Sequence, residues 1–296
     1  MKTTFNIVHS VTDLDNDLPL LYFKSGYFNS QQHERLICYE NNKFFFPVSN
    51  DGQTAISIPR SPFGSFFKKE ECTLNEFESF FSNLKDDLHK RQIETLKVTH
   101  PSMIYDSFIE EEWFHKVGFQ ENYSDFNQHI DLKNELNLHK MQERKLETLN
   151  REGFTFQKLP TEQLKTAHQF VKVCRMAQGL EINIPFETLN QLFQETKSYD
   201  IFAVIRDEKI SALCISARVT DKVAYYYLPA TSPMFRNQSP MVLLIKGMVD
   251  YYRDEGFETL DLGVSSVMGK PQETLILFKE RMGGMETTKK TFQLSL

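Results

Sequence analysis

The residues best suited to hold a phosphate lie just before a predicted helix. Arg236 and Asn237 stand in the loop TSPMFRNQS, and Ser239 and Pro240 lead into an apolar run. A guanidinium and the unbonded amides of a helix start both attract an anion. Pro240 has the fixed φ that suits a first helical turn, and we expect the Ser239 side chain to cap the helix. The alternative for Arg236 is an ordinary surface arginine.

Groups that could move protons lie on the strands predicted on either side of this loop and helix. Tyr225, Tyr226 and Tyr227 are consecutive in the first strand, and Asp261 ends the second. A phenol can donate a proton, and a carboxylate can accept one or orient a substrate. Because side chains alternate across a strand, Tyr225 and Tyr227 share one face, so only that face or the face of Tyr226 can meet a cleft. Strand packing is the alternative for each tyrosine, and a solvated or capping carboxylate is the alternative for Asp261.

Metal, disulfide and hydrolase chemistry have little support in the sequence. Seven of the eight histidines lie before residue 140, and none forms a close His-x-His or His-x₃-His pair, so we expect no metal site. The four cysteines are far apart, which argues against a zinc knuckle and a disulfide framework. Ser102, Ser265 and Ser266 lack the Gly-x-Ser-x-Gly context of a serine hydrolase.

The segment Ile201–Val264 contains the elements that must position the candidate residues. It reads as three strands joined by two short charged turns, then a loop, a helix and a fourth strand. Alternating β-branched and aromatic residues predict antiparallel strands, and the run Met241–Tyr252 predicts the helix. Two helical stretches, residues 162–178 and 186–197, precede it.

The same order of elements occurs earlier in the chain, which favours duplication of one α/β unit. The strands RLICY, FFFPVS and TAISIPR are followed by a helix with the capping-box pair Thr73 and Glu76, and then by the strand IETLKV. Each copy is followed by a closing strand, FNQHIDL or TFQLSL. The matched positions are Lys43 with Lys209, Ser61-Pro62 with Ser232-Pro233, and Glu94-Thr95-Leu96 with Glu258-Thr259-Leu260.

Length and composition are those of a globular protein with two domains. The chain has 296 residues, of which 40% are apolar and 25% charged, and we place the boundary between residues 1–132 and 133–296. The net charge of −6 argues against broad binding to nucleic acid or to an anionic membrane. No apolar run is long enough to cross a bilayer or to form a signal peptide, so we expect a cytoplasmic protein without membrane insertion. The sequence does not indicate an oligomeric state.

This pattern of elements is similar to the GNAT acyltransferase fold, and its duplication resembles tandem GNAT proteins. Among these are the Fem-type aminoacyltransferases that build peptidoglycan cross-bridges, and relatives that acylate other small acceptors. The resemblance covers nearly the whole chain and implies an α/β (α+β) fold of two units, each a mixed, mostly antiparallel sheet flanked by helices. The residues that carry it are SPFG (61–64), LLIKGMVDYYRDEGFETLDLG (243–263) and LFKERMGG (277–284).

The resemblance also implies further site residues. The GNAT reaction is a direct attack of an amine on an activated acyl group, for which the tyrosines and the aspartate above would serve in proton transfer. Lys270 and Lys279 fall where related enzymes line the cleft, with Lys279 assigned to the donor and Lys270 to the acceptor; a solvated helix face is the alternative. Ser61, Phe63 and Gly64 lie in a Pro-aromatic-Gly segment that would shape an acceptor groove, although a plain turn also explains it.

The donor loop departs from the pattern of ordinary GNAT enzymes, Arg/Gln-x-x-Gly-x-Gly/Ala. Both glycines are absent, and Pro240 has no amide to offer a phosphate. Fem-type proteins also lack a clean glycine loop, so the departure is consistent with them; decay of the site is the other explanation. The residues in this place are Arg236, Asn237, Gln238, Ser239, Pro240 and Met241.

We therefore expect an N-acyltransferase that moves an acyl group from an acyl-CoA-like donor to a small-molecule amine held between the two units. The second unit would hold the donor, and the donor site of the first would be degenerate. Acyl-CoA would be a co-substrate, and no tightly bound cofactor is expected. The alternatives are a non-catalytic GNAT-like protein that binds a small molecule or a protein, and an aminoacyl-tRNA-dependent Fem-type transferase. The chain lacks the long helical hairpin with which some Fem proteins grip tRNA, which argues against the last alternative.

Overall fold

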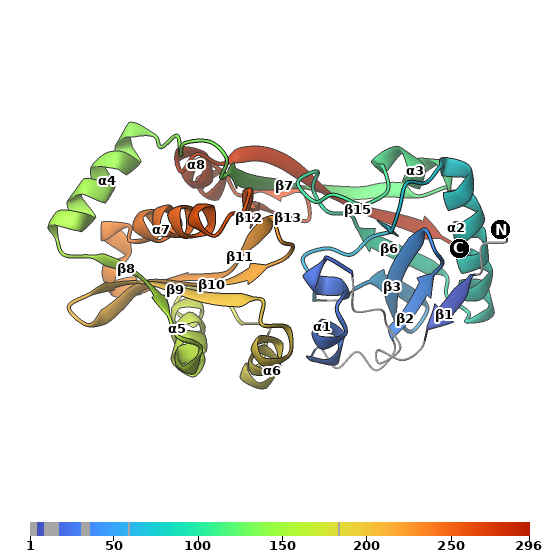
Figure 1. Ribbon diagram of the computed structural model, residues 1–296, viewed down its shortest axis with the longest axis horizontal. Helices are drawn as coiled ribbons and strands as arrows, with labels where there is room; N and C mark the ends of the chain where they lie inside the picture. Colours follow the sequence, from blue (N-terminus) through green and yellow to red (C-terminus); the bar gives the residue numbers. More distant parts are fainter. Residues whose placement is uncertain (1–4, 9–17, 31–35, 59, 183) are drawn as a thin grey trace. The chain divides into compact units, whose positions relative to one another are not determined.

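The chain divides into two compact units, each described by itself below. The computed structural model describes residues 5–8, 18–30, 36–58, 60–182 and 184–296 (Figure 1). Most of the first ten residues, where a signal peptide would begin, lie outside these residues. The first unit comprises Met1–Phe126, Ser266–Lys270 and Thr287–Leu296, and the second comprises Asn127–Ser265 and Pro271–Glu286.

The first unit is built on a mixed sheet whose only parallel pair among the described strands is β4 with β6. Its strands follow the order β1 (Asn6–Val8), β2 (Leu36–Glu40), β3 (Phe44–Asp51), β4 (Thr54–Ser57), β6 (Thr95–Thr99) and β15 (Met285–Ser295), and the short β5 (Phe67–Lys68) pairs with β3. Its helices are α1 (Ser25–Ser30), α2 (Leu74–Lys90) and α3 (Glu111–Lys116).

Helix α2 forms for the reasons that its sequence suggests. The Thr73 hydroxyl accepts the amide of Glu76 at 3.4 Å, and the Glu76 carboxylate accepts the amide of Thr73 at 2.9 Å, which confirms the capping box. One face of the helix is buried against the sheet, as its apolar spacing predicts. The buried residues are Phe77, Phe80, Phe81, Leu84 and Leu88, so these aromatic rings belong to the core.

The second unit repeats this plan with longer strands. Its sheet follows the order β7 (Gln120–Asp131), β12 (Thr259–Val264), β11 (Val223–Thr231), β10 (Lys209–Arg218), β9 (Tyr199–Arg206) and β8 (Thr155–Leu159). The pair β11 with β12 is parallel, and its other described pairs are antiparallel. Its helices are α4 (Lys140–Arg151), α5 (Leu164–Met176), α6 (Phe186–Thr196), α7 (Met241–Asp254) and α8 (Glu273–Arg281). Two short strands that follow β12, β13 (Ser266–Val267) and β14 (Lys270–Pro271), pair with each other, and all their residues except Pro271 belong to the first unit.

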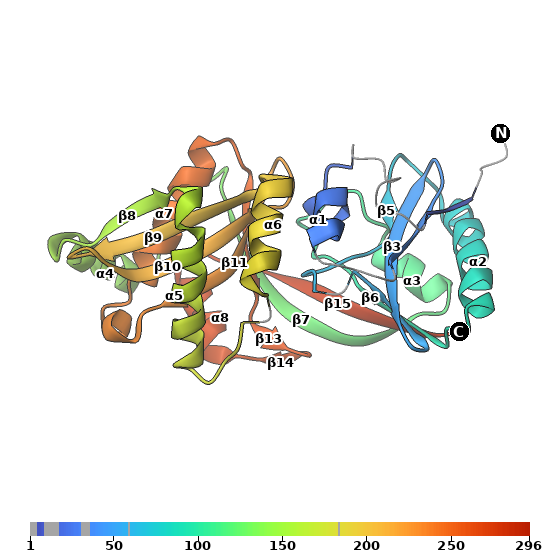
Figure 2. The same cartoon turned by 90° about the horizontal axis from the view of Figure 1, so that it is seen from below.

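The helices of the second unit cover both faces of its sheet. Figure 1 shows α7 on one face and α5 and α6 on the other, and Figure 2 shows α5 and α6 lying side by side across the strands. The two units share one connectivity, in which three antiparallel strands lead through a helix (α2 or α7) to a strand parallel to the third. The predicted fold class and the predicted repeat are thus confirmed.

Each closing strand pairs in the unit formed by the other sequence copy, and not in the unit of the copy that it follows. Residues 127–131 of β7, which come after the first copy, pair with β12 in the second unit. Residues 291–295 of β15, which come after the second copy, pair with β6 in the first. Each sheet is therefore completed by residues remote in sequence, and the boundary at residue 132 stays a prediction.

Helix α7 is held close to its sheet at two points. Gly247 faces Phe156 so closely that a Cβ there would lie 2.3 Å from the ring, so a larger residue would push the helix away. Near the other end, the buried hydroxyl of Tyr252 lies 2.8 Å from the Ser216 hydroxyl and 3.1 Å from the Asp200 carboxylate. These contacts fix the helix whose start follows the candidate phosphate loop.

A buried histidine in the first unit makes its stability depend on pH. His100 is 7% exposed, and its Nδ1 lies 2.9 Å from the Ser65 hydroxyl. Burial, together with the charge of Lys290, lowers the pKa of His100 to about 3. In an unfolded chain the pKa of histidine is near 6.5. Below that pH the unfolded state binds a proton that the folded state does not bind, so the free energy of unfolding decreases.

When the pH is lowered from 7.5 to 5.5, we predict that the free energy of unfolding decreases in wild type by about 1.4 kcal/mol more than in His100→Gln. Urea unfolding at the two pH values measures this difference. Equal losses in the two proteins would show that His100 is not buried in its neutral form.

Candidate functional site

Three side chains of the second unit form a row across neighbouring strands. Tyr225 of β11 is the direct partner of Asp261 of β12, and Asp261 is the direct partner of His129 of β7. Partners across a sheet point to the same face, with Cβ atoms about 5 Å apart. The register therefore brings a phenol, a carboxylate and an imidazole side by side.

This row lies at the last paired position of the two parallel strands. β11 and β12 pair only over residues 223–225 and 259–261, although β11 continues to Thr231 and β12 to Val264. Backbone groups beyond the row are thus not used in pairing these two strands with each other. The separation places the side chains of the row at the end of the parallel pairing.

A bulge in β12 ends the regular register next to the row. Asp261 pairs with His129, but the next pair is Gly263 with Gln128, so β12 has one residue more than β7. Gly263 has φ +73°, and a Cβ there would lie 3.1 Å from the Tyr225 hydroxyl oxygen. Asp261 Oδ1 accepts hydrogen bonds from the Gly263 amide at 2.9 Å and from Asn127 Nδ2 at 3.0 Å. Only glycine suits this backbone and leaves room for the tyrosine.

Lys279 holds the bulge from the side of α8. Its side chain is 3% exposed, and its ammonium donates to the carbonyl oxygens of Gly263 at 2.7 Å and of Val264 at 3.0 Å. A phosphate contact would require these bonds to break. The sequence placed Lys279 among the donor-binding residues, and the structure gives it a structural role instead.

Burial keeps the acid and the base of the row uncharged near neutral pH. It lowers the pKa of His129, although the carboxylates of Asp261 and Asp131 act in the opposite direction. Burial and then the charge of Asp261 raise the pKa of Tyr225, and burial raises the pKa of Tyr227 to about 12. The Nδ1 atom of His129 is buried and has no hydrogen-bond partner among the described residues. The row thus offers a neutral imidazole as proton acceptor and a neutral phenol as proton donor.

The first unit provides an internal comparison, because its parallel pair β4 and β6 is also three residues long. The positions that correspond to Tyr225, Asp261 and His129 are Ile56 of β4, Lys97 of β6 and Gln293 of β15. This row has neither a carboxylate nor an imidazole. The two copies share a backbone plan, and the second alone combines a phenol, a carboxylate and an imidazole at these positions.

The other two candidate tyrosines lie on opposite faces, as their alternation predicts. Tyr227 shares the face of Tyr225, with the two ring centroids 6.2 Å apart. Tyr226 is 8% exposed in the core, and its hydroxyl donates to the Met241 sulfur at 2.6 Å. The structure therefore places Tyr226 under α7 and outside the row.

The predicted helix cap at Ser239 is wrong. Pro240 is the N-cap residue of α7, and no side-chain hydrogen bond caps the helix. Ser239 has φ +59°, whereas a capping serine needs extended backbone. Its backbone is used instead, since its amide donates to Arg236 O and its carbonyl accepts from Val242, both at 3.1 Å. Arg236 and Asn237 are exposed on the 3-10 helix Pro233–Gln238, and their use in phosphate binding stays a prediction.

The candidate acceptor residues of the first unit belong largely to its packing. Phe63 is 2% exposed among aromatic rings, and the Gly64 amide donates to Thr99 O at 3.0 Å. A Cβ on Gly64 would lie 2.8 Å from the Ile58 side chain. The Ser61 hydroxyl donates to Phe63 O at 2.5 Å, and Lys270 is exposed on β14. An acceptor role for these residues stays a prediction.

Sequence reasoning missed His129 and Asn127. Both lie in FNQHIDL, two positions apart, so alternation puts them on one face. What identifies them is their pairing with β12, which the sequence does not reveal.

Within the described part of the chain, no group of three or more His, Cys, Asp or Glu side chains could hold a metal ion. No described helix is both long and apolar enough to cross a bilayer.

Comparison with known proteins supports the expected family resemblance. Residues 137–269 match the family model of the acetyltransferase (GNAT) domain. Among solved structures, FemX has a TM-score of 0.69 at 12% identity, with 98% of this chain and 97% of FemX covered. No curated protein matches the chain.

Two further solved structures share the fold. The C-terminal domain (DUF2156) assigned to a lysylphosphatidylglycerol synthetase of Agrobacterium fabrum has a TM-score of 0.63 at 14% identity, with coverage of 90% of this chain and 87% of that one. A tandem GNAT protein from the clavulanic acid biosynthesis pathway has a TM-score of 0.58 at 10% identity, with coverage of 99% and 98%. The resemblance to GNAT proteins and to their tandem and Fem-type members is thus confirmed. At these identities the solved structures establish the fold alone.

The contacts of Lys279 lead to a stability prediction. Lys279→Met would leave two buried carbonyl groups without their donor, so we expect a loss of about 1–3 kcal/mol of unfolding free energy. Lys270→Met, at an exposed lysine, is the matched control and should change it by no more than about 0.5 kcal/mol. Denaturant unfolding of the two variants measures this, and equal stabilities would contradict the structural role of Lys279.

Proposed function

We propose, from the GNAT domain that residues 137–269 match, that this protein is an N-acyltransferase that transfers an acyl group to an amine on its second unit. The observation that carries the proposal is the row of Tyr225, Asp261 and His129 at the point where β11 and β12 part. The corresponding row of the first unit has no phenol, carboxylate or imidazole, which favours the second unit as the reactive one.

His129 would act as the base of the reaction. An ammonium must lose a proton before its nitrogen can attack a carbonyl carbon, and a neutral buried imidazole can accept that proton. Nδ1 of His129 is the buried nitrogen without a described partner. Asp261 would stabilise the imidazolium that forms, since its charge acts to raise the pKa of His129.

Tyr225 would act as the acid. As the amine nitrogen bonds to the acyl carbon, the bond from that carbon to the leaving sulfur or oxygen breaks, and the leaving group takes up a proton. The Tyr225 phenol is protonated because burial and Asp261 raise its pKa. The proton taken by His129 leaves with solvent, and a solvent proton restores the phenol, so the cycle closes without a net change in the enzyme.

The donor in this proposal is an acyl-CoA-like thioester with its phosphates near Arg236 and Asn237, at the start of α7. These residues are exposed and follow the strand that carries Tyr225. The absence of loop glycines, the left-handed Ser239 and the missing amide of Pro240 favour a second candidate, an aminoacyl-tRNA donor as expected for a Fem-type transferase. The chemistry of the row is the same for either donor.

Titration with acetyl-CoA separates the two donors. We predict saturable binding to wild type in calorimetry and affinity about tenfold weaker for Arg236→Ala, because a charged hydrogen bond to phosphate is lost. Arg144→Ala, an exposed arginine on α4, is the control and should bind like wild type. Absence of acetyl-CoA binding to wild type, with transfer from a labelled aminoacyl-tRNA, would replace the CoA donor by the tRNA donor.

The state of His129 predicts a pH dependence. Since burial lowers its pKa, the imidazole should titrate below 6.5 in NMR, and Asp261→Asn should lower the pKa further by removing a nearby negative charge. The base must be neutral, so kcat/KM should fall only as the pH decreases through this depressed value. His129→Gln should reduce kcat/KM about 10²- to 10⁴-fold.

The control for His129→Gln is His89→Gln, at an exposed histidine of α2, which should leave the rate and its pH profile unchanged. The thiol released from acetyl-CoA in the presence of primary amines gives the rate. A His129 pKa above 6.5, or an unchanged rate in His129→Gln, would exclude this residue as the base.

A further inference from the structure

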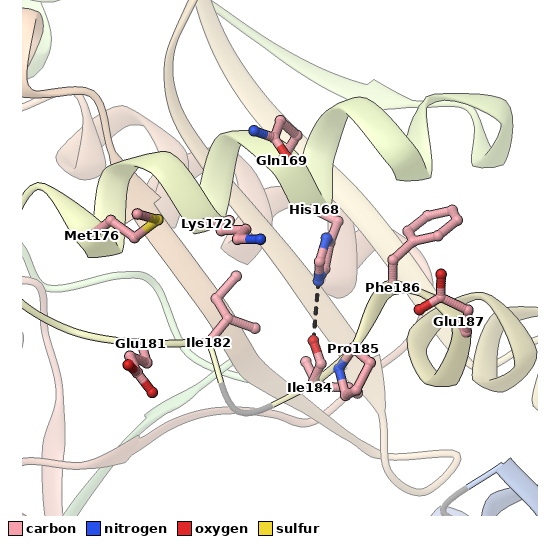
Figure 3. A pocket seen from close by; sticks show the side chains of 10 residues that line it. All are labelled: His168, Gln169, Lys172, Met176, Glu181, Ile182, Ile184, Pro185, Phe186 and Glu187. Atoms are coloured by element: carbon pink, nitrogen blue, oxygen red, sulfur yellow. Dashed lines mark hydrogen bonds between the residues drawn. The ribbon is translucent and has the colours of Figure 1, made fainter.

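A cavity of about 680 Å³ opens between α5 and the segment formed by residues 181–182 and 184–187, which ends in the first turn of α6 (Figure 3). Figure 3 shows Lys172 and Met176 projecting from α5 on one side of it, and Glu181 and Ile182 on the segment on the other. Its volume is in the range of small-molecule sites in proteins. The row of Tyr225, Asp261 and His129 does not contribute to its lining.

A buried histidine fixes the segment to the helix. His168 of α5 is 9% exposed, and its Nε2 donates to Ile184 O at 3.0 Å. Its ring centroid lies 5.7 Å from that of Phe186, at an interplanar angle of 61°. The cavity is thus shaped before a ligand arrives, which lowers the entropic cost of binding.

The lining combines charges of both signs with an apolar surface. Lys172 contributes an ammonium, and Glu181 and Glu187 contribute carboxylates. In the part of the chain that the structure describes, none of these three forms a salt bridge. The apolar surface is supplied by Met176, Ile182, Ile184 and Phe186. Unpaired charges of opposite sign around apolar side chains match a ligand that has both charges and an apolar body.

The helix that lines one side of the cavity also packs on the strand that carries the proposed acid. Helix α5 packs on β11, which carries Tyr225. The charge of Arg175, on the same helix, acts to lower the pKa of Tyr225 and Tyr227. A ligand held along α5 therefore lies on a helix that borders the face of the row.

We propose that this cavity binds a short apolar peptide of about dipeptide size with a free amino group and a free carboxylate. Glu181 and Glu187 attract its ammonium, Lys172 pairs with its carboxylate, and the apolar side chains contact Ile182 and Phe186. This inference is independent of the proposed acyl transfer, because none of the three residues of the row lines the cavity.

Calorimetry with three related probes and no donor tests the binding. Leu-Leu should bind wild type saturably, N-acetyl-Leu-Leu more weakly because its ammonium is absent, and Leu-Leu-amide more weakly because its carboxylate is absent. Lys172→Met should weaken Leu-Leu about fivefold and leave Leu-Leu-amide unchanged, since only the first has the carboxylate that Lys172 contacts. Glu181→Gln should weaken both probes that have an amino group.

The matched control is Lys165→Met, an exposed lysine on α5 outside the cavity, which should bind all three probes like wild type. No saturable binding of Leu-Leu to wild type would overturn the proposal. So would a Lys172→Met variant that loses Leu-Leu-amide as strongly as Leu-Leu.

A separate assay distinguishes failure of this inference from failure of the proposed function. Leu-Leu binding in the stated pattern, with no transfer from acetyl-CoA or aminoacyl-tRNA to any amine, would overturn the acyltransferase proposal and leave the peptide site standing. Transfer to other amines at a rate that Lys172→Met does not change, without Leu-Leu binding, would overturn the peptide site and leave the transferase standing.

Discussion

The bulge of β12 at Gly263 is the constraint on which the candidate site depends. Both backbone polar groups of Gly263 are bonded to side chains, the amide to Asp261 and the carbonyl to Lys279. The missing Cβ leaves space for Tyr225, and the left-handed φ shifts the register beyond the row. A single glycine thus couples the position of the carboxylate, the clearance of the phenol and the buried lysine of α8. This explains why Lys279 is buried, with its ammonium on the Gly263 carbonyl.

The sequence predicts the elements well because each has a local cause. The period of two in the strands, the capping box of Thr73 and Glu76, and the repeated order of strands and helix need only neighbouring residues to be read. Two local expectations fail for physical reasons. Ser239 is held left-handed by its backbone bonds, so it does not cap, and Lys279 is buried because two carbonyl groups satisfy its charge, against the usual preference of lysine for the surface.

The candidate site is less predictable, because it is assembled by pairing between distant segments. Asp261 and Tyr225 could be selected from strand positions, but His129 becomes relevant only when β7 is known to pair with β12. The exchange of closing strands hides that pairing, since FNQHIDL follows the first copy in sequence and completes the sheet of the second. The same pairing distinguishes the two copies, because Ile56, Lys97 and Gln293 occupy the corresponding positions in the first unit.

The exchange of closing strands also bears on how the protein matures on the ribosome. The first unit has nearly all its residues once Phe126 has been made, but its strand β6 has no partner in β15 until residues 287–295 emerge. An edge strand left open for so long is exposed to wrong pairing with other chains. Synthesis in the order of the chain therefore leaves β6 as an open edge strand until residues 291–295 have been made.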